Sequence, residues 1–157
     1  MPAVTPCLWF DMKALEAAEF YTGVFPNSKI LSTSYYPEDG PFPPGTVLTV
    51  EFELDGSRFT GLNGGPQFTF SEAVSFKIDC GDQDEVDHYW NSLIADGGEE
   101  SQCGWLEDRF GVSWQVVPRR LMELLTDPDP KVAERVSDVM MKMHKIEIAQ
   151  LEEAARG

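Results

Sequence analysis

Gln115 is a polar residue whose position is not explained by packing alone. It lies in residues 102–118, where two runs rich in Trp, Leu and Val flank residues 108–111, a pattern that predicts a β-hairpin. Side chains alternate between the two faces of a strand. The apolar face of the returning strand is formed by Val112, Trp114 and Val116. Gln115 falls on the other face, where its carboxamide can donate and accept hydrogen bonds, so it is a candidate ligand-binding residue.

Three further features suggest chemistry, and each has a structural alternative. Cys103 could be a nucleophile only beside a base or a cation. No histidine partner is evident, so burial as a small apolar residue is the better prediction. Glu51 and Glu53 share a strand face, but like charges resist joint burial, and solvent exposure explains them more simply. Trp105 either stacks on a ligand or packs under the C-terminal helix.

The sequence contains no metal-binding or cofactor-binding motif. His88 and His144, the only histidines, lie in predicted helices, and neither a His-x-x-x-His motif nor a paired cysteine spacing occurs. Residues 64–66 follow a hairpin strand and residues 97–98 follow a helix, whereas a nucleotide-type cofactor needs a glycine-rich turn between a strand and a helix. We therefore expect no metal and no cofactor.

The charge of the chain limits its partners. With 27 acidic and 12 basic residues its net charge is −15, so nucleic acids and anionic membranes would repel it. No apolar run is long enough to span a membrane, and no signal-peptide pattern opens the chain. Three cysteines without close spacing fit a reducing compartment. We expect a cytoplasmic protein that binds neither nucleic acid nor membrane.

The predicted elements occur twice in the same order. Residues 4–10, 28–36, 47–54 and 58–62 read as strands, with a helix capped by Asp11 after the first. Residues 73–80 begin the second series, followed by a helix over 83–95, a short strand and the hairpin. Asp11 and Asp79, like Tyr21 and Tyr89, stand 68 residues apart. The sequence therefore predicts a duplicated β-α-β-β-β unit.

The C-terminal part is helical. A short helix over residues 121–126 precedes a break at 127–130 and a last helix. The narrow apolar stripe of that helix comprises Val132, Val136, Val139, Met143 and Ile146. Such a stripe fits packing on the helix's own domain as well as contact with a partner helix in a dimer.

Several motifs together resemble a known family. They are FYTGVFPNS (20–28), LNGGP (62–66), VDHYW (86–90), QCGW (102–105) and DRFGVSWQVVP (108–118). They resemble the vicinal-oxygen-chelate, or glyoxalase/bleomycin-resistance, superfamily, and within it the PhnB-like branch, often labelled demethylubiquinone methyltransferase-like. The resemblance implies an α+β fold in which modules at about 4–66 and 72–118 form one domain (1–118), followed by a helical extension (119–157).

The resemblance also implies a half-barrel cleft in the curled sheets. The positions at which metal-dependent members bind a divalent ion become Pro6, Asn63, Ala73 (or Glu72, if the alignment slips by one) and Gln115. Proline and alanine offer no donor, and neutral amides are weak ligands, so we expect no metal. The cleft-facing side chains would be Leu8, Phe10, Phe59, Gly61, Asn63, Ser75, Lys77, Ser113, Gln115 and Val117.

These considerations give a candidate function. The predicted ligand-binding residues are Leu8, Phe10, Asn63, Ser75, Lys77, Cys103, Trp105 and Gln115. We expect a homodimer that binds a small organic ligand without metal, and leave open whether it also turns the ligand over. One alternative is a catalytically silent binding or regulatory module whose polar groups only satisfy one another. Another is the methyltransferase that the family label suggests.

Overall fold

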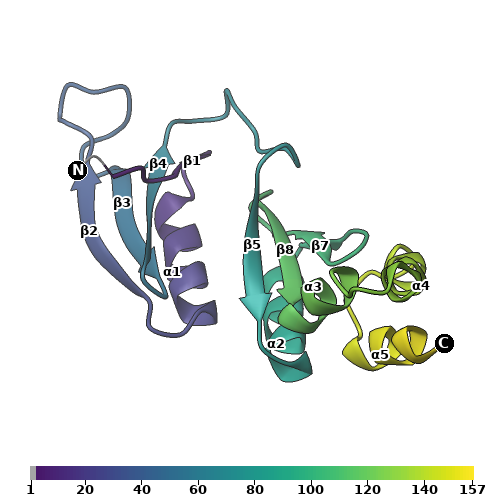
Figure 1. Ribbon diagram of the computed structural model, residues 1–157. Helices are drawn as coiled ribbons and strands as arrows, with labels where there is room; N and C mark the ends of the chain where they lie inside the picture. Colours follow the sequence, from purple (N-terminus) through teal and green to yellow (C-terminus); the bar gives the residue numbers. More distant parts are fainter. Residues whose placement is uncertain (1–2) are drawn as a thin grey trace. The chain divides into compact units, whose positions relative to one another are not determined.

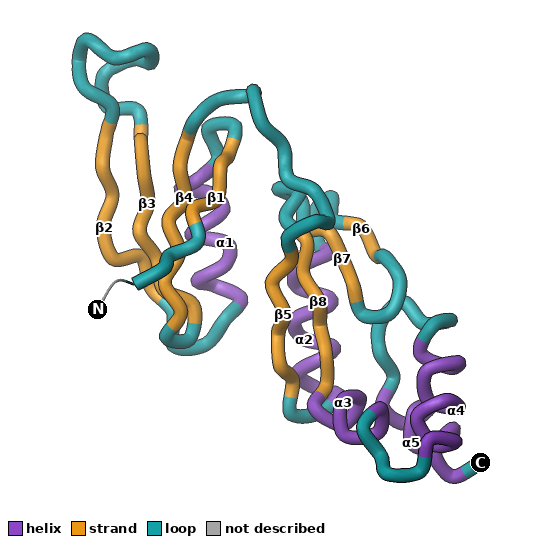
Figure 2. Tube along the Cα trace, turned by 45° about the horizontal axis from the view of Figure 1, so that its top comes forward, coloured by secondary structure: helices purple, strands orange, loops and turns teal. Residues whose placement is uncertain are grey.

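The computed structural model describes residues 3–157 and divides the chain into two compact units, Met1–Phe70 and Ser71–Gly157. Each unit contains a four-stranded sheet, which is accompanied by α1 in the first unit and by α2 to α5 in the second (Figures 1 and 2). Among the described residues, no helix has the length and apolar character needed to cross a bilayer.

The first unit is one β-α-β-β-β module. It consists of β1 (Cys7–Phe10), α1 (Ala14–Val24), β2 (Lys29–Tyr35), β3 (Val47–Leu54) and β4 (Ser57–Asn63). The sheet order is β1-β4-β3-β2, with β1 parallel to β4 and the other pairs antiparallel. A tight turn with Asp55 and Gly56 both at positive φ joins β3 to β4. A proline- and glycine-rich loop, which includes residues 37–45, separates β2 from β3.

Helix α1 packs on its sheet through small residues. Ala14, Ala17 and Ala18 are fully buried, and a Cβ placed on Gly61 would lie 3.3 Å from the Cβ of Ala14, so glycine permits this close approach. The predicted N-cap at Asp11 is wrong. The helix begins at Ala14 with Lys13 as N-cap and without a local side-chain cap, because a residue from β4 takes over this role, as described below.

The second unit repeats the topology. Its strands and helix are β5 (Ser75–Cys80), α2 (Gln83–Ile94), β6 (Glu99–Glu100), β7 (Trp105–Glu107) and β8 (Ser113–Pro118). The order β5-β8-β7-β6, with β5 parallel to β8, matches the first sheet. The predicted α+β fold with two β-α-β-β-β modules is therefore confirmed. Val74, predicted in the strand, precedes β5 and is exposed.

A buried carboxylate organises the β7–β8 hairpin. Asp108 is almost fully buried and accepts hydrogen bonds from the backbone amides of Phe110 and Val112. Its other oxygen accepts one from the indole of Trp114 at 2.8 Å. A buried carboxylate must be satisfied in this way, because an unpaired charge is costly to bury. Gly111, at the end of the predicted hairpin connection 108–111, adopts positive φ.

Three helices follow β8: α3 (Arg119–Leu125), α4 (Pro130–Met140) and α5 (Ile148–Arg156). The prediction that one helix runs through Ile146 is wrong. Helix α4 ends at Met140 because the next segment bonds to the β6–β7 turn: the amides of Cys103 and Gly104 donate to the carbonyls of Met143 and His144. The apolar stripe packs within this chain, in one cluster of Val117, Leu121, Leu124, Val136, Met143, Ile146 and Leu151.

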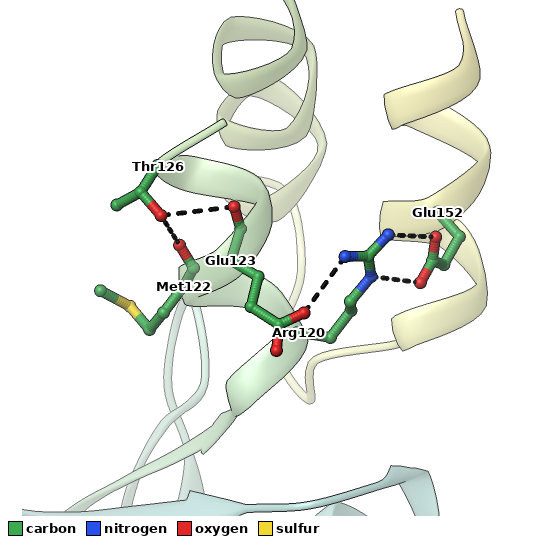
Figure 3. Close-up of polar contacts among 5 residues, drawn as sticks. All are labelled: Arg120, Met122, Glu123, Thr126 and Glu152. Atoms are coloured by element: carbon green, nitrogen blue, oxygen red, sulfur yellow. Dashed lines mark hydrogen bonds and ion pairs between the residues drawn. The ribbon is translucent and has the colours of Figure 1, made fainter. Parts of the chain in front are cut away.

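A guanidinium group ties α5 to α3. Arg120 donates from Nε and Nη2 to the two carboxylate oxygens of Glu152 at 2.6 and 3.1 Å, and from Nη1 to Glu123 at 3.1 Å (Figure 3). Thr126 closes α3 by donating to the carbonyls of Met122 and Glu123. The side chain of Arg120 is 42% exposed, so this pair orients the helix more than it stabilises it.

Candidate functional site

The candidate residues of the first unit lie against α1. Leu8, Phe10 and Asn63 are buried on the sheet face that this helix covers, together with Phe59 and Gly61. The carboxamide oxygen of Asn63 accepts a hydrogen bond from the amide of Ala14 at 2.8 Å, and its Nδ2 donates to the carbonyl of Val47 at 3.1 Å. Asn63 thus caps α1 from across the sheet. The assignment of these side chains to a cleft face is wrong for this unit.

Trp9 lies on the opposite face of the same sheet. Its indole donates to the carbonyl of Gly65 at 2.9 Å, and its ring packs edge-on against Phe68, with ring centroids 4.9 Å apart. Trp9 therefore lies on the sheet face away from α1, whereas Trp90 and Trp114 are buried core residues. Both faces of β1 carry large side chains, so alternation could not tell which face meets the helix.

The candidate residues of the second unit do share a face. Strand pairing aligns Lys77, Gln115 and Trp105 in one row across β5, β8 and β7, and Ser75, Ser113 and Glu107 in the next. The amide of Gln115 donates to the hydroxyl of Ser75 at 2.9 Å. Alternation places this face opposite the buried side chains of Ile78, Trp114 and Val116. The structure thus brings together Ser75, Lys77, Trp105 and Gln115.

Cys103 stands in the β6–β7 turn, at φ 57°. It is partly exposed rather than buried, and its thiol lies 3.7 Å from the sulfur of Met141. Its environment is set by the C-terminal segment, which the sequence did not predict to reach this turn. Cys80 is the buried cysteine, and burial raises its pKa to about 12, which keeps it an unreactive thiol.

A pocket of about 130 Å³ opens at the same edge of the second unit. It is lined by Glu72, Glu99, Glu100, Ser101, Trp105, Leu106, Glu107 and Ser113. Of the eight predicted ligand-binding residues, only Trp105 is among them. None of these four glutamates was predicted to bind a ligand, because the negative charge was used only to exclude nucleic acids and anionic membranes as partners. A signal was present: Glu99 and Glu100 are separated by only the turn 101–104 from a hairpin strand that ends in Glu107.

The electrostatics of this pocket are dominated by repulsion. Glu99 and Glu107 stand directly opposite each other across the β6–β7 pair. Burial raises the pKa of Glu107, and the neighbouring carboxylates of Glu99, Glu72 and Asp108 raise it further. Glu100 is partly satisfied, since it accepts a hydrogen bond from the indole of Trp90 at 2.9 Å.

Ser113 is the polar residue that this pocket leaves without a protein partner. It is 3% exposed, and its hydroxyl makes no hydrogen bond within residues 3–157. In the same part of the chain, no fully enclosed side-chain nitrogen or oxygen lacks a partner. The hydroxyl of Ser113 therefore opens into the pocket that it lines.

The residues present do not fit a divalent metal. At the four positions that the resemblance implies for the ion, Pro6 and Ala73 have no side-chain donor, Asn63 bonds to α1 and Gln115 bonds to Ser75. If the alignment slips from Ala73 to Glu72, the set gains only a single carboxylate. In the part of the chain that the structure describes, no three His, Cys, Asp or Glu side chains converge in a way that could hold a metal ion.

The described connections between strands and helices also do not fit a nucleotide-type methyl-donor cofactor. Residues 64–66 follow β4 and continue into a long connection instead of a helix. Three connections in the described chain join a strand to a helix: residues 11–13, residues 81–82 and the direct passage from β8 into α3. They contain a single glycine, Gly81, so none of them is a glycine-rich phosphate-binding turn.

Comparisons with known proteins place the chain in a family. The family model described as 3-demethylubiquinone-9 3-methyltransferase matches residues 2–117. A PhnB protein of Bacillus cereus, described with the same activity, is 36% identical, with a TM-score of 0.68 over 74% of this chain and 99% of that one. No curated protein matches the sequence.

Two more distant solved structures share the fold. A protein of Pseudomonas aeruginosa is 18% identical, with a TM-score of 0.62 over 75% of this chain and 98% of that one. The fosfomycin resistance protein FosX of Listeria monocytogenes, solved with Mn(II) and sulfate, is 13% identical, with a TM-score of 0.52 over 74% and 89%. The chain therefore belongs to the PhnB-like family described as 3-demethylubiquinone-9 3-methyltransferase.

Proposed function

We propose that this protein binds a small organic ligand, without a divalent metal, on the face of the second sheet opposite α2. The observation that carries the proposal is the cross-strand row of Lys77, Gln115 and Trp105. It places an exposed ammonium group, a half-buried carboxamide and a half-buried aromatic ring on three adjacent strands. A few polar groups beside an aromatic surface are typical of small-molecule sites.

The proposal concerns binding and not turnover. The row offers no histidine, carboxylate or thiol placed beside a nucleophile, which acyl transfer or general acid–base catalysis would need. Methyl transfer rests on the description of the family alone, because the strand-to-helix turns of this chain do not fit its cofactor. A silent module remains the competing function, and the Gln115–Ser75 hydrogen bond is the observation in its favour.

The test is a thermal-shift screen of metabolites on protein stripped of metal with EDTA. A ligand that binds only the folded state raises the melting temperature. For any compound that does so, Gln115→Leu should remove the increase while the ligand-free melting temperature stays near that of the wild type. Gln102→Leu is the matched control, because Gln102 is an exposed carboxamide of the β6–β7 turn.

Two results would overturn the proposal. The first is a ligand whose stabilising effect disappears with EDTA and returns with a divalent ion. The second is full retention of ligand stabilisation by both Gln115→Leu and Lys77→Met. Stabilisation lost equally in Gln115→Leu and Gln102→Leu would also contradict it, since only one of these side chains lies in the row.

The proposal includes a homodimer in the cytoplasm, as the resemblance to paired-module proteins implies. The C-terminal stripe does not support the dimer, because Val136 and Ile146 are fully buried within this chain. Any dimer contact must therefore lie elsewhere. Light scattering at micromolar concentration should give twice the chain mass, and a monomer mass would remove this part of the proposal.

A further inference from the structure

We infer that the pocket of the second unit, lined by Glu72, Glu99, Glu107, Trp105 and Ser113, binds the ammonium group of an organic amine. The inference rests on the proposed function, because it assigns a chemical class to the small ligand. The pocket adjoins the proposed row directly: Trp105 belongs to both, and Ser113 is the strand neighbour two residues before Gln115.

The first support is charge. The pocket lining contains four glutamates and no lysine or arginine, and of these the Glu100 carboxylate already accepts a hydrogen bond from the indole of Trp90. Two of them, Glu99 and Glu107, are directly opposed across an antiparallel strand pair, an arrangement that destabilises a sheet. A cation between them would turn this repulsion into attraction. Burial, and then the nearby carboxylates of Glu99 and Glu72, raise the pKa of Glu107, in agreement with the opposed positions of Glu99 and Glu107.

The second support is independent of the carboxylates. Ser113 is almost fully buried, yet its hydroxyl has no hydrogen-bond partner in residues 3–157 and faces the pocket. A buried hydroxyl requires a partner, and here only a ligand or water can supply one. Its oxygen can accept a hydrogen bond from an N–H group of a protonated amine.

The third support is the chemistry of the wall. Trp105 contributes an aromatic side chain on the same sheet face as Gln115, beside the glutamates. Aromatic surface attracts organic cations through its quadrupole and also contacts their carbon atoms. A bare metal ion gains nothing from such a wall, and no three carboxylates in the described chain converge to hold one. The volume of about 130 Å³ suits a head group of a few atoms.

The probe is n-butylammonium, with n-butanol as the uncharged analogue of nearly the same shape. Titration followed by 1H–15N correlation spectra of the full chain should move the amide signals of residues 99–107 and 113 with butylammonium, and leave them in place with n-butanol. Glu107→Gln should weaken butylammonium binding at least tenfold, and Ser113→Ala about threefold. Glu153→Gln, which removes an exposed carboxylate of α5, should leave binding unchanged.

Several outcomes overturn the inference. Equal binding of butylammonium and n-butanol removes the role of charge. Magnesium or manganese ions that move the same signals while the amine does not would indicate a metal site. Unchanged amine affinity in both Glu107→Gln and Ser113→Ala would show that the amine binds elsewhere, and preserved signal dispersion confirms that the variants are folded.

The same variants separate this inference from the proposed function. If a screened ligand loses binding in Gln115→Leu while butylammonium leaves residues 99–113 untouched, the proposed function holds and the amine pocket fails. If butylammonium binds with the expected dependence on Glu107 while no ligand depends on Gln115 or Lys77, the pocket holds and the proposed row fails.

Discussion

The two sheets share a topology but differ in the lengths of their outer strands. In the first sheet, β2 and β3 have seven and eight residues; in the second, β6 and β7 have two and three. The parallel pair at the other edge, β1–β4 or β5–β8, is kept in both. The pocket lies where the second copy is shortened, lined by residues of β6 and β7. A duplicated fold can thus acquire a pocket where its two copies differ in strand length.

The two copies also solve the same local problems with different residues. Helix α1 receives its capping oxygen from Asn63, 49 residues away, whereas α2 is capped by the adjacent Asp82, which accepts from the amide of Glu85. The β3–β4 turn is a tight one at Asp55 and Gly56, whereas the β7–β8 turn is held by the buried Asp108. A single substitution in each copy can test whether these residues stabilise the protein as described.

The largest effect is expected at Asp108. Asp108→Ala leaves the amides of Phe110 and Val112 and the indole of Trp114 without this acceptor. Orphaned buried donors cost about 1–3 kcal/mol each, so we expect a total loss of about 3 kcal/mol once partial exposure is considered. Urea denaturation at neutral pH measures it. The matched change in the first hairpin, Asp55→Ala, should cost about 1 kcal/mol, for positive φ alone. Equal losses in the two hairpins would contradict this account.

The next effect compares the helix caps. Asn63→Ala removes two hydrogen bonds from a buried position and should cost about 2 kcal/mol. Asp82→Ala removes an exposed cap and should cost about 1 kcal/mol. Hydrogen exchange of the first turn of each helix localises the loss. Unchanged stability of Asn63→Ala would show that Asn63 does not cap α1. The predicted role of Asn63 in ligand binding would then have to be considered again.

The order of elements was predictable, but some orientations were not. The repeat and the strand alternation in residues 47–54 and 112–118 predicted the topology and the faces of β8 correctly. The faces of β1 were assigned wrongly because Leu8 and Trp9, both large and apolar, fall on opposite sides. Capping by Asn63 depends on a contact across the sheet, which no local pattern encodes.

The predicted last helix was wrong and the pocket was not predicted for a similar reason. The apolar periodicity of residues 132–146 continues through a segment that leaves the helix in order to bond to the β6–β7 turn. The pocket depends on the register that places Glu99 opposite Glu107, and a two-residue strand gives too short a pattern to reveal its register. In both cases tertiary pairing overrides the local sequence signal.

A smaller effect, with opposite signs in the two sheets, is expected for cross-strand charges. In the second sheet Glu107 faces Glu99, whereas in the first Glu53 faces Arg58. Glu107→Gln should therefore stabilise the protein by about 0.5 kcal/mol at neutral pH, and Glu53→Gln should destabilise it by a similar or smaller amount. Urea denaturation at several pH values measures both.

The pH dependence of the Glu107 effect follows from its raised pKa. The folded state holds the proton of Glu107 more tightly than the unfolded chain does. Its contribution to stability is therefore present at acidic pH and is lost as the pH rises from the ordinary glutamate pKa through the raised one. The gain from Glu107→Gln should appear above that range and vanish near pH 3. A gain that is equal at pH 3 and pH 7 would rule out charge as its cause.

The smallest expected effect concerns the extension, which the second unit carries and the first does not. Asp87 of α2 accepts hydrogen bonds from Lys145 at 2.8 Å and from Gln83 at 2.9 Å. These contacts, that of Lys145 first, lower the pKa of Asp87, so its contribution is present above the unfolded pKa and is lost as the pH falls through the lowered one. Asp87→Asn should lower the free energy of unfolding by about 0.3 kcal/mol at neutral pH, a value reduced by solvent screening, and should have no effect near pH 2.

Asp79→Asn is the control. Asp79 and Arg119 are 63% and 65% exposed, so their ion pair should contribute nothing measurable to stability. Identical behaviour of the two variants would show that the pair between α2 and the extension is no stronger than an ordinary surface contact.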